Sequence, residues 1–420
     1  MSVSKAKTLD FRLKVRRLFF VFVSEMRKNC KLFQEAIMAE AKEMYPRVDF
    51  LYLSEEDMIK AGVKDMAGCI DAMEEMFKLM KIGNYRMGGA NGNSHGTMVT
   101  FPEKSPFPEM PVDGPDRRFM AMPAYLGGKF DMAGCKWYGS NADNRGKGLP
   151  RSILMLVLND KDTGCPVAFM SANILSAYRT GAVPGVGFKY FSREDSSTVG
   201  IVGPGVMSKT ALAAIMAVRS GIKTVKVKGR GAASLESFIG MAKEDYPGVD
   251  FVKVESIEEA VRDSDIVYVS TSVPTGSVDN YPYIKEEWIK KGAMICTTAA
   301  LRFDEDFVVN RARNVADNVK LYEAWEDEYS PDAFNTIPIP AVYVEDLISS
   351  GKMTRDQLDD LGDVLTGKAP VHRKDDEIVI YSVGGMPVED VAWGTIVYRN
   401  ALEKGIGTKL NLWETPKMVV

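Results

Sequence analysis

The sequence predicts an α/β fold, in which a doubly wound parallel sheet is inserted in a second domain of the α+β type. Three observations indicate this fold. Short apolar runs alternate with helical segments between residues 198 and 297, which is typical of a parallel sheet covered by helices. The blocks on either side have a different texture, with loops rich in glycine, proline and asparagine over residues 87–115. The length of 420 residues leaves room for two or three domains.

The central elements follow one another in a regular order. The apolar run 199–202 is the first strand, because a Gly-Pro-Gly turn ends it and apolar residues at helical spacing follow. Residues 224–228 alternate in polarity, which predicts the second strand. The same reasoning predicts helices over 206–219, 232–243 and 257–262, and strands over 250–254, 265–270 and 292–297. Outside this unit it predicts strands over 153–158 and 378–382, and helices over 354–365 and 388–404.

Charge and cysteine content exclude several classes of protein. The 53 lysines and arginines nearly balance the 57 aspartates and glutamates, so neither nucleic acid nor a membrane is expected as a partner. The five cysteines are widely spaced without a C-x-x-C pair, which favours reduced thiols in the cytoplasm over disulfides. Only two histidines, His95 and His372, are present, and neither lies near a Cys/His ligand pattern, so no metal site is expected.

The N-terminal segment combines basic and apolar residues. Lys14, Arg16 and Arg17 precede six apolar residues at 18–23, which are too few to cross a membrane and short for a signal-peptide core. We expect a helical extension over 1–48 that packs on its own protein. Binding of this helix to a membrane or a partner is the alternative.

The turn after the first central strand carries a nucleotide-binding signature. Its sequence is Gly200-x-x-Gly203-x-Gly205-x-x-Ser208, between a strand and a helix. In that context glycines allow a tight turn and close approach of a pyrophosphate, which the helix N-terminus then binds. The signature predicts a Rossmann-type dinucleotide site, although a glycine turn without ligand is the alternative. The residues expected at the cofactor are Gly203, Pro204, Gly205, Val206, Met207, Thr271, Ser272 and Val273.

The end of the second central strand bears on the choice of cofactor. NAD sites normally place a carboxylate there for the ribose 2′-hydroxyl. Here the strand ends in Lys228-Gly229-Arg230, without an acid. Arg230 could instead bind a 2′-phosphate, which favours NADP over NAD. A solvated arginine on a loop is the alternative.

Several ordered motifs resemble the ornithine cyclodeaminase/mu-crystallin family. The resemblance covers roughly residues 50–415, with the glycine turn in the expected place between the motifs. The motifs are Lys136-Trp137-Tyr138 with Asn141 and Asn144, Gly148-Leu149-Pro150, Leu156-Val157-Leu158-Asn159-Asp160 with Thr163-Gly164, Ala177-Tyr178-Arg179-Thr180-Gly181-Ala182, Gly367-Lys368-Ala369-Pro370, Gly384-Gly385-Met386-Pro387-Val388-Glu389-Asp390 and Gly405-Ile406-Gly407-Thr408. Together these ordered motifs are specific, whereas one alone would not be.

This resemblance implies an NAD(P)-dependent oxidoreductase that acts on the carbon–nitrogen bond of an amino acid or its imine, as ketimine reductases and amino-acid dehydrogenases do. It implies a homodimer formed through the domain that does not bind the nucleotide. Lys136 resembles the family lysine beside the substrate carboxylate and reacting carbon, and Arg179 the arginine that clamps the carboxylate, with Thr180 at the cofactor. Arg86 resembles a second, upstream carboxylate-binding arginine. Without the resemblance, Arg179 would be read as an interdomain salt-bridge residue and Lys136 as a solvated lysine.

Two departures from the family pattern limit this comparison. Cyclodeaminases carry an aspartate soon after the fifth strand, where this chain offers only Asp304 as the nearest acid. Members that act on ornithine tend to place a glutamate just before a Met-Pro pair, whereas Met122-Pro123 follows Phe119-Met120-Ala121. An apolar wall binds a cation poorly, so a less charged or aromatic substrate side chain is expected.

The sequence is also compatible with two other functions, and it leaves the roles of two extra segments undecided. The alternatives are an ammonia-releasing cyclodeaminase with bound NAD and a non-catalytic dinucleotide-binding accessory subunit. Residues 94–118 and 322–336 exceed the family pattern and are either a lid over an altered pocket or surface decoration. His95 is expected to be solvated on its loop, although it could reach the site, and His372 is expected at the surface.

These observations divide the chain into four segments. The helical extension occupies residues 1–48, and the first part of a substrate and dimerisation domain occupies 49–192. The NAD(P)-binding domain covers 193–322. Residues 323–420 return to the substrate and dimerisation domain.

Overall fold

The computed structural model describes residues 47–89, 91–274 and 276–416. The predicted helical extension over 1–48 therefore lies almost wholly outside the described residues. The chain divides into two units, Leu51–Thr408 and a second that joins Met1–Phe50 to Lys409–Val420. In the second unit, Asp49 forms ion pairs with Arg47 and Lys409, at 2.8 and 3.0 Å. Within the described ranges, no helix has both the length and the apolar character that a membrane span requires.

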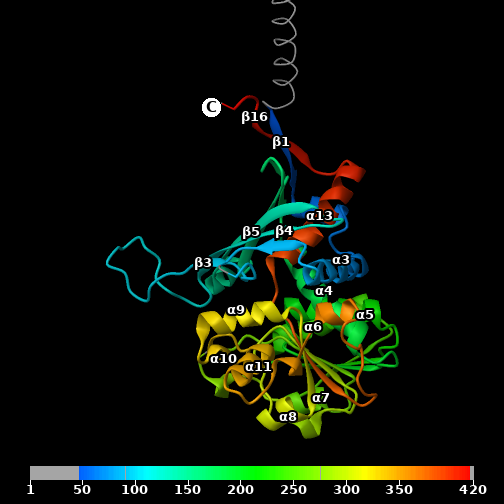
Figure 1. Cartoon of the computed structure of the whole chain (residues 1–420). Helices are drawn as coiled ribbons and strands as arrows, with labels where there is room; N and C mark the ends of the chain where they lie inside the picture. The colour runs from blue at the N-terminus through cyan, green and yellow to red at the C-terminus, as the bar shows by residue number, and fades with distance from the viewer. Residues whose placement is uncertain (1–46, 90, 275, 417–420) are drawn as a thin grey trace, which may run out of the picture. The chain divides into compact units, whose positions relative to one another are not determined.

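The first sheet of the large unit is mainly antiparallel (Figure 1). Its strands run in the order β1-β7-β6-β5-β4-β2, with β3 also paired to β4, and β1 is parallel to β7. The edge strand β16 pairs with β1. The bounds are β1 (Val48–Leu53), β2 (Tyr85–Met87), β3 (Thr97–Val99), β4 (Arg118–Leu126), β5 (Met132–Ser140), β6 (Ser152–Asn159), β7 (Pro166–Ser171) and β16 (Thr408–Trp413).

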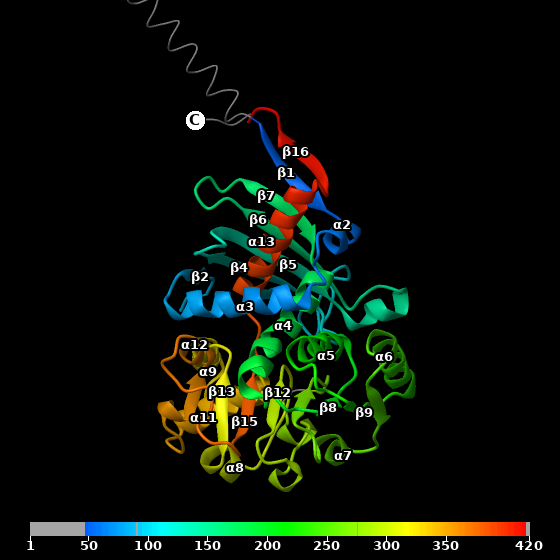
Figure 2. The same ribbon diagram turned by 90° about the vertical axis from the view of Figure 1, so that its right-hand side faces the viewer.

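The two faces of this sheet differ in what covers them. Side chains alternate along each strand, so Met120, Met122 and Lys136 share the buried face. Helix α13 (Pro387–Lys404) packs on that face against β4, β5 and β6, and α3 (Met66–Lys81) packs beside α13 (Figure 2). The opposite face carries Phe119 and Trp137, which are 43% and 41% exposed. The outer face is therefore apolar and accessible.

The second sheet is parallel throughout and confirms the predicted doubly wound fold. Its strand order is β10-β9-β8-β11-β12-β15-β13-β14. The bounds are β8 (Thr198–Val202), β9 (Thr224–Lys228), β10 (Asp250–Lys253), β11 (Ile266–Val269), β12 (Met294–Thr297), β13 (Ala312–Ala316), β14 (Leu358–Asp360) and β15 (Ile378–Ser382). The chain winds in opposite directions from β8, and the crevice at such a switch point is where α/β sheets bind ligands.

The last three strands of this sheet correct two predictions. The nucleotide-binding domain does not end at residue 322, because β13, β14 and β15 belong to the same sheet. The chain returns to the first sheet only with α13. The helix predicted over 354–365 is instead a 3₁₀ turn (Arg355–Gln357), strand β14 and α12 (Leu361–Leu365). Pairing of β14 with β13 explains the difference, because hydrogen bonds to a neighbouring strand override local helix propensity.

Helix α4 (Asn173–Phe191) connects the two sheets and brings the site residues to their junction (Figure 2). It packs closely on α5 (Val206–Val218). A Cβ added to Gly181 would lie 2.5 Å from Cβ of Thr210, so only glycine permits this approach. The glycine that follows Arg179-Thr180 in the sequence thus fixes α4 against the helix that begins at the glycine turn.

Most of the remaining helices cover the parallel sheet or link its strands, whereas the helix Glu55–Lys60 and the 3₁₀ turn Ala142–Lys147 lie beside the first sheet. The segment 322–336, predicted as lid or decoration, forms most of α9 and all of α10. Trp325 and Phe334 within it are buried, so these two aromatic side chains belong to the core, whereas residues 330–332 are exposed. The bounds are α2 (Glu55–Lys60), α6 (Ala232–Asp245), α7 (Ile257–Val261), α8 (Glu305–Asn310), α9 (Val319–Tyr329), α10 (Ala333–Thr336) and α11 (Pro340–Ser349), with 3₁₀ turns at Ala142–Lys147, Val278–Asn280 and Glu286–Trp288.

Candidate active site

A cavity of about 550 Å³ lies where the first sheet, α4 and the start of α5 meet. Its wall includes the buried face of β4 to β6, the first turns of α4 and the glycine turn. Among the predicted site residues it contains Lys136, Arg179, Thr180, Gly205, Val206, Met207 and Ser272. Residues distant in the sequence, from both sheets, therefore share one cavity.

Lys136 is a buried cation at the floor of this cavity. Its side chain is 2% exposed, and Nζ lies 2.7 Å from Oδ2 of Asp390 and 3.4 Å from Oγ of Ser176. Burial, followed by the nearby Arg179 guanidinium, lowers the pKa of Lys136 to about 8, against the opposing effect of Asp390. A lysine with a pKa near neutrality can exchange a proton with a bound substrate.

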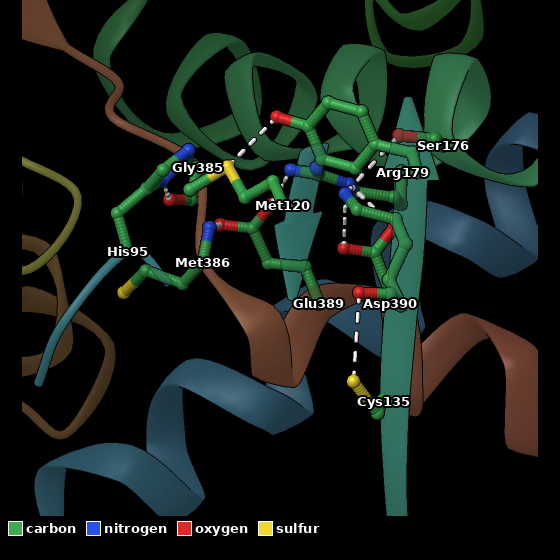
Figure 3. Close-up of polar contacts among 11 residues, drawn as sticks. His95, Met120, Cys135, Ser176, Arg179, Gly385, Met386, Glu389 and Asp390 are labelled. Atoms are coloured by element: carbon green, nitrogen blue, oxygen red, sulfur yellow. Dashed lines mark hydrogen bonds and ion pairs between the residues drawn. The ribbon is translucent and has the colours of Figure 1, made fainter. Parts of the chain in front are cut away.

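Arg179 is held by two acids at the start of α13 (Figure 3). Its Nε donates to Oδ1 of Asp390 at 3.1 Å, and its Nη1 donates to Glu389. Figure 3 shows the three side chains pointing toward one another between α4 and α13. Among the described residues Nη2 has no hydrogen-bond partner, so this nitrogen remains available to an anion in the cavity.

The buried acids determine the charge of this cluster. Burial, opposed by Arg179, raises the pKa of Glu389 to about 7. Burial also acts against the charge of Arg179, but the carboxylates of Asp390 and Glu389 outweigh it and raise the pKa of Arg179. The arginine is therefore permanently charged and fixed in orientation. Removing one member of such a buried cluster typically costs about 3–5 kcal/mol of stability.

His95 lines the cavity, contrary to the expectation of a solvated loop histidine. Its Nδ1 lies 2.6 Å from the carbonyl oxygen of Gly385, and its ring centroid lies 5.9 Å from that of Trp325. Burial lowers the pKa of His95 to about 4, so the ring is neutral at physiological pH. With Nδ1 donating to the carbonyl, Nε2 is the acceptor.

A second cavity of about 920 Å³ adjoins the first along the carboxyl ends of β8, β9 and β11. The predicted cofactor residues Gly203, Pro204, Gly205, Arg230, Thr271, Ser272 and Val273 all line it. Four residues, namely Arg145, Gly205, Ser270 and Ser272, line both cavities. A ligand in this groove would therefore reach toward the cavity that contains Lys136.

The glycine turn fits a dinucleotide. Gly203 has φ +94°, and a Cβ there would lie 2.3 Å from the carbonyl oxygen of Ser270. A Cβ added to Gly205 would meet nothing within 4 Å, which leaves the backbone open to a close ligand. No side chain caps the N-terminus of α5, so its amide groups are free to bind a pyrophosphate. Oγ1 of Thr271 is buried without a hydrogen-bond partner in the described part of the chain, which suits a ligand contact.

Arg86 and Asp304, the other two predicted site residues, do not reach either cavity. Arg86 is exposed on β2 and donates from Nη1 to the carbonyl oxygens of Tyr85 and Gly83, at 2.6 and 3.2 Å. Asp304 precedes α8, where its Oδ1 accepts a hydrogen bond of 2.6 Å from the hydroxyl of Tyr283. Both predictions relied only on the position of the residue in the sequence. The strand that carries Arg86 and the helix start at Asp304 direct these side chains away from the cavities.

The sequence reasoning missed several residues that the fold brings to the cavity. Glu389 and Asp390 belong to the motif 384–390, and two adjacent acids within the apolar first half of a helix are a usable signal for a buried charged site. Three arginines also line the cavity: Arg118, Arg145 and Arg151. Their spacing in the sequence has no regular pattern, so only the tertiary structure shows that they converge.

Comparison with known proteins identifies the family of this chain. The model of the ornithine cyclodeaminase/mu-crystallin family matches residues 62–405 of this chain. The chain belongs to this family. A relative from Staphylococcus aureus, N-((2S)-2-amino-2-carboxyethyl)-L-glutamate dehydrogenase, is 26% identical over 368 residues, covering 87% of this chain and 99% of the relative.

Solved structures of family members agree with the fold. The Δ1-pyrroline-2-carboxylate reductase of Thermococcus litoralis, in complex with NADH and L-proline, has a TM-score of 0.69 and 25% identity, covering 86% of this chain and 99% of its own. An archaeal alanine dehydrogenase dimer with bound NAD has a TM-score of 0.69 and 26% identity, covering 87% and 100%. These relatives confirm the predicted class, an NAD(P)-dependent oxidoreductase of carbon–nitrogen bonds.

Proposed function

We propose that this protein interconverts an α-amino acid and the corresponding imine, with a nicotinamide dinucleotide as redox partner. The observation that carries the proposal is the shared wall of the two cavities. Gly205, Ser270 and Ser272 border both the nucleotide groove and the cavity above Lys136 and Arg179. A substrate held in the smaller cavity would thus lie next to the reacting end of a dinucleotide. When bound, that group supplies or accepts the hydride.

Arg179 is the proposed carboxylate ligand. Its Nε and Nη1 are engaged by Asp390 and Glu389, which leaves Nη2 to donate to one carboxylate oxygen. A guanidinium fixed in this way orients the substrate as well as binding it. The α-carbon is then held in one position relative to the nucleotide groove.

Lys136 is the proposed proton donor. In the reducing direction the imine carbon gains a hydride and the nitrogen gains a proton, so an acid beside the nitrogen accelerates the reaction. Lys136 is buried and protonated below a pH of about 8. Its hydrogen bond to Asp390 keeps the ammonium in place while leaving further protons to donate.

NADP is the proposed form of the dinucleotide, and NAD is the alternative. The groove wall at the end of β9 consists of Lys228, Gly229, Arg230 and Gly231, without a carboxylate. Arg230 donates from Nη2 to the carbonyl oxygen of Ser272 at 2.7 Å, which holds it over the groove. A guanidinium in this position favours a 2′-phosphate over a free ribose hydroxyl.

The proposal includes a homodimer in the cytoplasm. The exposed apolar face that carries Phe119 and Trp137 offers a surface for a second copy of the chain. The described cysteines Cys69, Cys135, Cys165 and Cys296 are free, as expected in a reducing compartment.

The experiment that tests the proposed function measures cofactor binding and turnover in the full chain. Calorimetry with NADPH and NADH is followed by an absorbance assay with cyclic imines and with keto acids plus amines. We expect tight NADPH binding and consumption of NADPH with an imine. Exchange of Arg179 for lysine should raise KM and lower kcat together, because lysine lacks the paired contacts with Asp390 and Glu389 that fix the orientation of the substrate-binding group. Ammonia release without net change in nicotinamide absorbance would instead identify a cyclodeaminase, and cofactor binding without turnover would contradict the catalytic proposal.

A further inference from the structure

The substrate cavity has an unusual balance of charge. Five cationic side chains line it: Arg118, Lys136, Arg145, Arg151 and Arg179. No carboxylate is among the lining residues. Two of the cations, Lys136 and Arg179, form the floor and are balanced by Glu389 and Asp390 behind them. The other three cations form a separate group, which we call the upper arginines.

The upper arginines come from three different elements. Arg118 begins β4, Arg145 lies in the 3₁₀ turn Ala142–Lys147, and Arg151 immediately precedes β6. Because neighbouring strands and the turn between them position these residues, their convergence is a property of the sheet rather than of one flexible loop. All three line the cavity that contains Lys136 and Arg179.

A single acid balances the upper arginines among the described residues. Asp116 forms ion pairs with Arg118 and, at 3.0 Å, with Arg151. The contact with Arg151 lacks hydrogen-bond geometry, because Oδ2 of Asp116 has no hydrogen-bond partner. Nε of Arg118 is also buried without a partner, and Arg145 forms no ion pair within the described ranges. Two guanidinium groups thus share one carboxylate, and the third has none among the described residues.

Placing these cations together has a cost that an anion would offset. Burial, then repulsion from Arg118 and Arg145, lowers the pKa of Arg151. An anion bound between these guanidinium groups would relieve the repulsion among them.

We propose that the substrate carries a second carboxylate, distant from the reacting carbon, and that the upper arginines bind it. This inference rests on the proposed function, because it assigns the α-carboxylate to Arg179. The substrate class is then an amino or imino dicarboxylate rather than a diamine. A cationic wall repels the side-chain ammonium of ornithine, so the cavity excludes diamines by charge as well as by its apolar surface.

The cofactor is a less suitable source of the anion. Arg118 and Arg151 line only the substrate cavity, whereas Gly203 and Pro204 of the glycine turn line only the nucleotide groove. Arg145 lines both cavities, so it alone could contact both ligands. Arg151 is therefore the residue whose exchange separates the two sources.

The turnover experiment compares two keto acids of similar length, each supplied with ammonium and NADPH. 2-Oxoglutarate carries a second carboxylate at C5, and 2-oxopentanoate carries a methyl group there. We expect the wild type to prefer 2-oxoglutarate by at least about tenfold in kcat/KM, as a charge-assisted contact predicts. Arg151→Met should lower kcat/KM for the dicarboxylate by about tenfold or more, and for the monocarboxylate by less than about threefold.

The control variant is Lys147→Met. Lys147 is an exposed cation in the 3₁₀ turn that also holds Arg145, and it does not line the cavity. The variant should leave both substrates unchanged. The affinity of Arg151→Met for NADPH should equal that of the wild type, and a weakened NADPH affinity would assign the anion to the cofactor. Equal effects of Arg151→Met on both keto acids would overturn the inference while leaving the proposed function intact.

A binding measurement keeps the inference testable without turnover. Calorimetry on the NADP-bound protein compares glutarate with pentanoate. If glutarate binds more tightly than pentanoate and this preference disappears in Arg151→Met, the second carboxylate site is supported even without turnover. Failure to reduce any keto acid would count against the proposed reaction alone. Equal binding of both acids would overturn the second site.

Discussion

Lys136 and Arg179 respond in opposite ways to the same buried environment. Both lie against Asp390, yet burial and the neighbouring guanidinium lower the pKa of Lys136, whereas two carboxylates raise that of Arg179. The lysine can therefore titrate near neutrality while the arginine keeps its charge. This division supports the proposed roles, proton transfer for Lys136 and carboxylate binding for Arg179.

The pH dependence of the reaction follows from Lys136. Its pKa of about 8 means that the ammonium donor is lost as the pH rises through 8. We expect kcat/KM for imine reduction to fall above pH 8, by about tenfold per pH unit. In the oxidative direction the unprotonated amine is needed, so the rate should rise over the same range.

Steady-state profiles of the wild type and of Lys136→Arg check this expectation. A guanidinium does not titrate in this range, so the inflection near pH 8 should disappear in the variant, whose overall rate is lower. Titration of the substrate affects the pH profiles of both proteins equally. The difference between the two profiles therefore reports the titration of Lys136. An unchanged inflection in the variant would show that another group titrates.

At the scale of elements, the contact between α4 and α5 determines where the site residues lie. Arg179 and Thr180 precede Gly181 on α4, and α5 begins at the glycine turn that borders the nucleotide groove. Because Gly181 has no side chain, the backbone of α4 can pack directly against Thr210 of α5. One glycine thus couples Arg179, the proposed carboxylate ligand, to the nucleotide groove.

Gly181→Ala should destabilise the protein and impair the site. The new Cβ would lie 2.5 Å from Thr210 Cβ and 2.6 Å from its backbone carbon, so the helices must separate. Overpacking of this kind costs about 1–3 kcal/mol. Denaturant unfolding gives the loss of stability, and NADPH calorimetry gives the effect on the groove.

The matched control is Gly240→Ala in α6, where an added Cβ meets nothing within 4 Å. Helix propensity predicts a gain of about 0.5–1 kcal/mol there. If both variants changed stability equally, the close approach at Gly181 would not be the cause.

At the scale of the whole molecule, the outer face of the first sheet determines the proposed assembly. Phe119, Trp137 and Ile153 are each exposed by more than 40%, and the rings of Phe119 and Trp137 stack with centroids 5.9 Å apart. Neighbouring strands place these side chains side by side. A contiguous apolar surface of this kind is typical of a protein–protein interface.

Trp137→Glu should weaken the homodimer. A charge placed in the centre of an apolar interface typically costs at least about 2 kcal/mol, or about thirtyfold in the dissociation constant. Sedimentation equilibrium measures the change. Leu402→Glu, which alters an exposed residue on α13, is the control and should leave the dimer unchanged. A monomeric wild type, or a variant as dimeric as the wild type, would contradict the proposed interface.

The sequence by itself determined the doubly wound fold and the nucleotide groove. Both depend on local signals, since strands, helices and the turn at Gly203 are encoded by residues close together in the chain. The resemblance to the family directed attention to Lys136 and Arg179, and the structure brings these two into one cavity.

Only the tertiary structure decided which charged groups meet. Glu389 and Asp390 lie more than 200 residues from Arg179, and the upper arginines come from separate elements. The misplaced Arg86 and Asp304 show the same limit. The direction of a side chain and the burial of a charge depend on non-local packing, and no pattern within one segment encodes them.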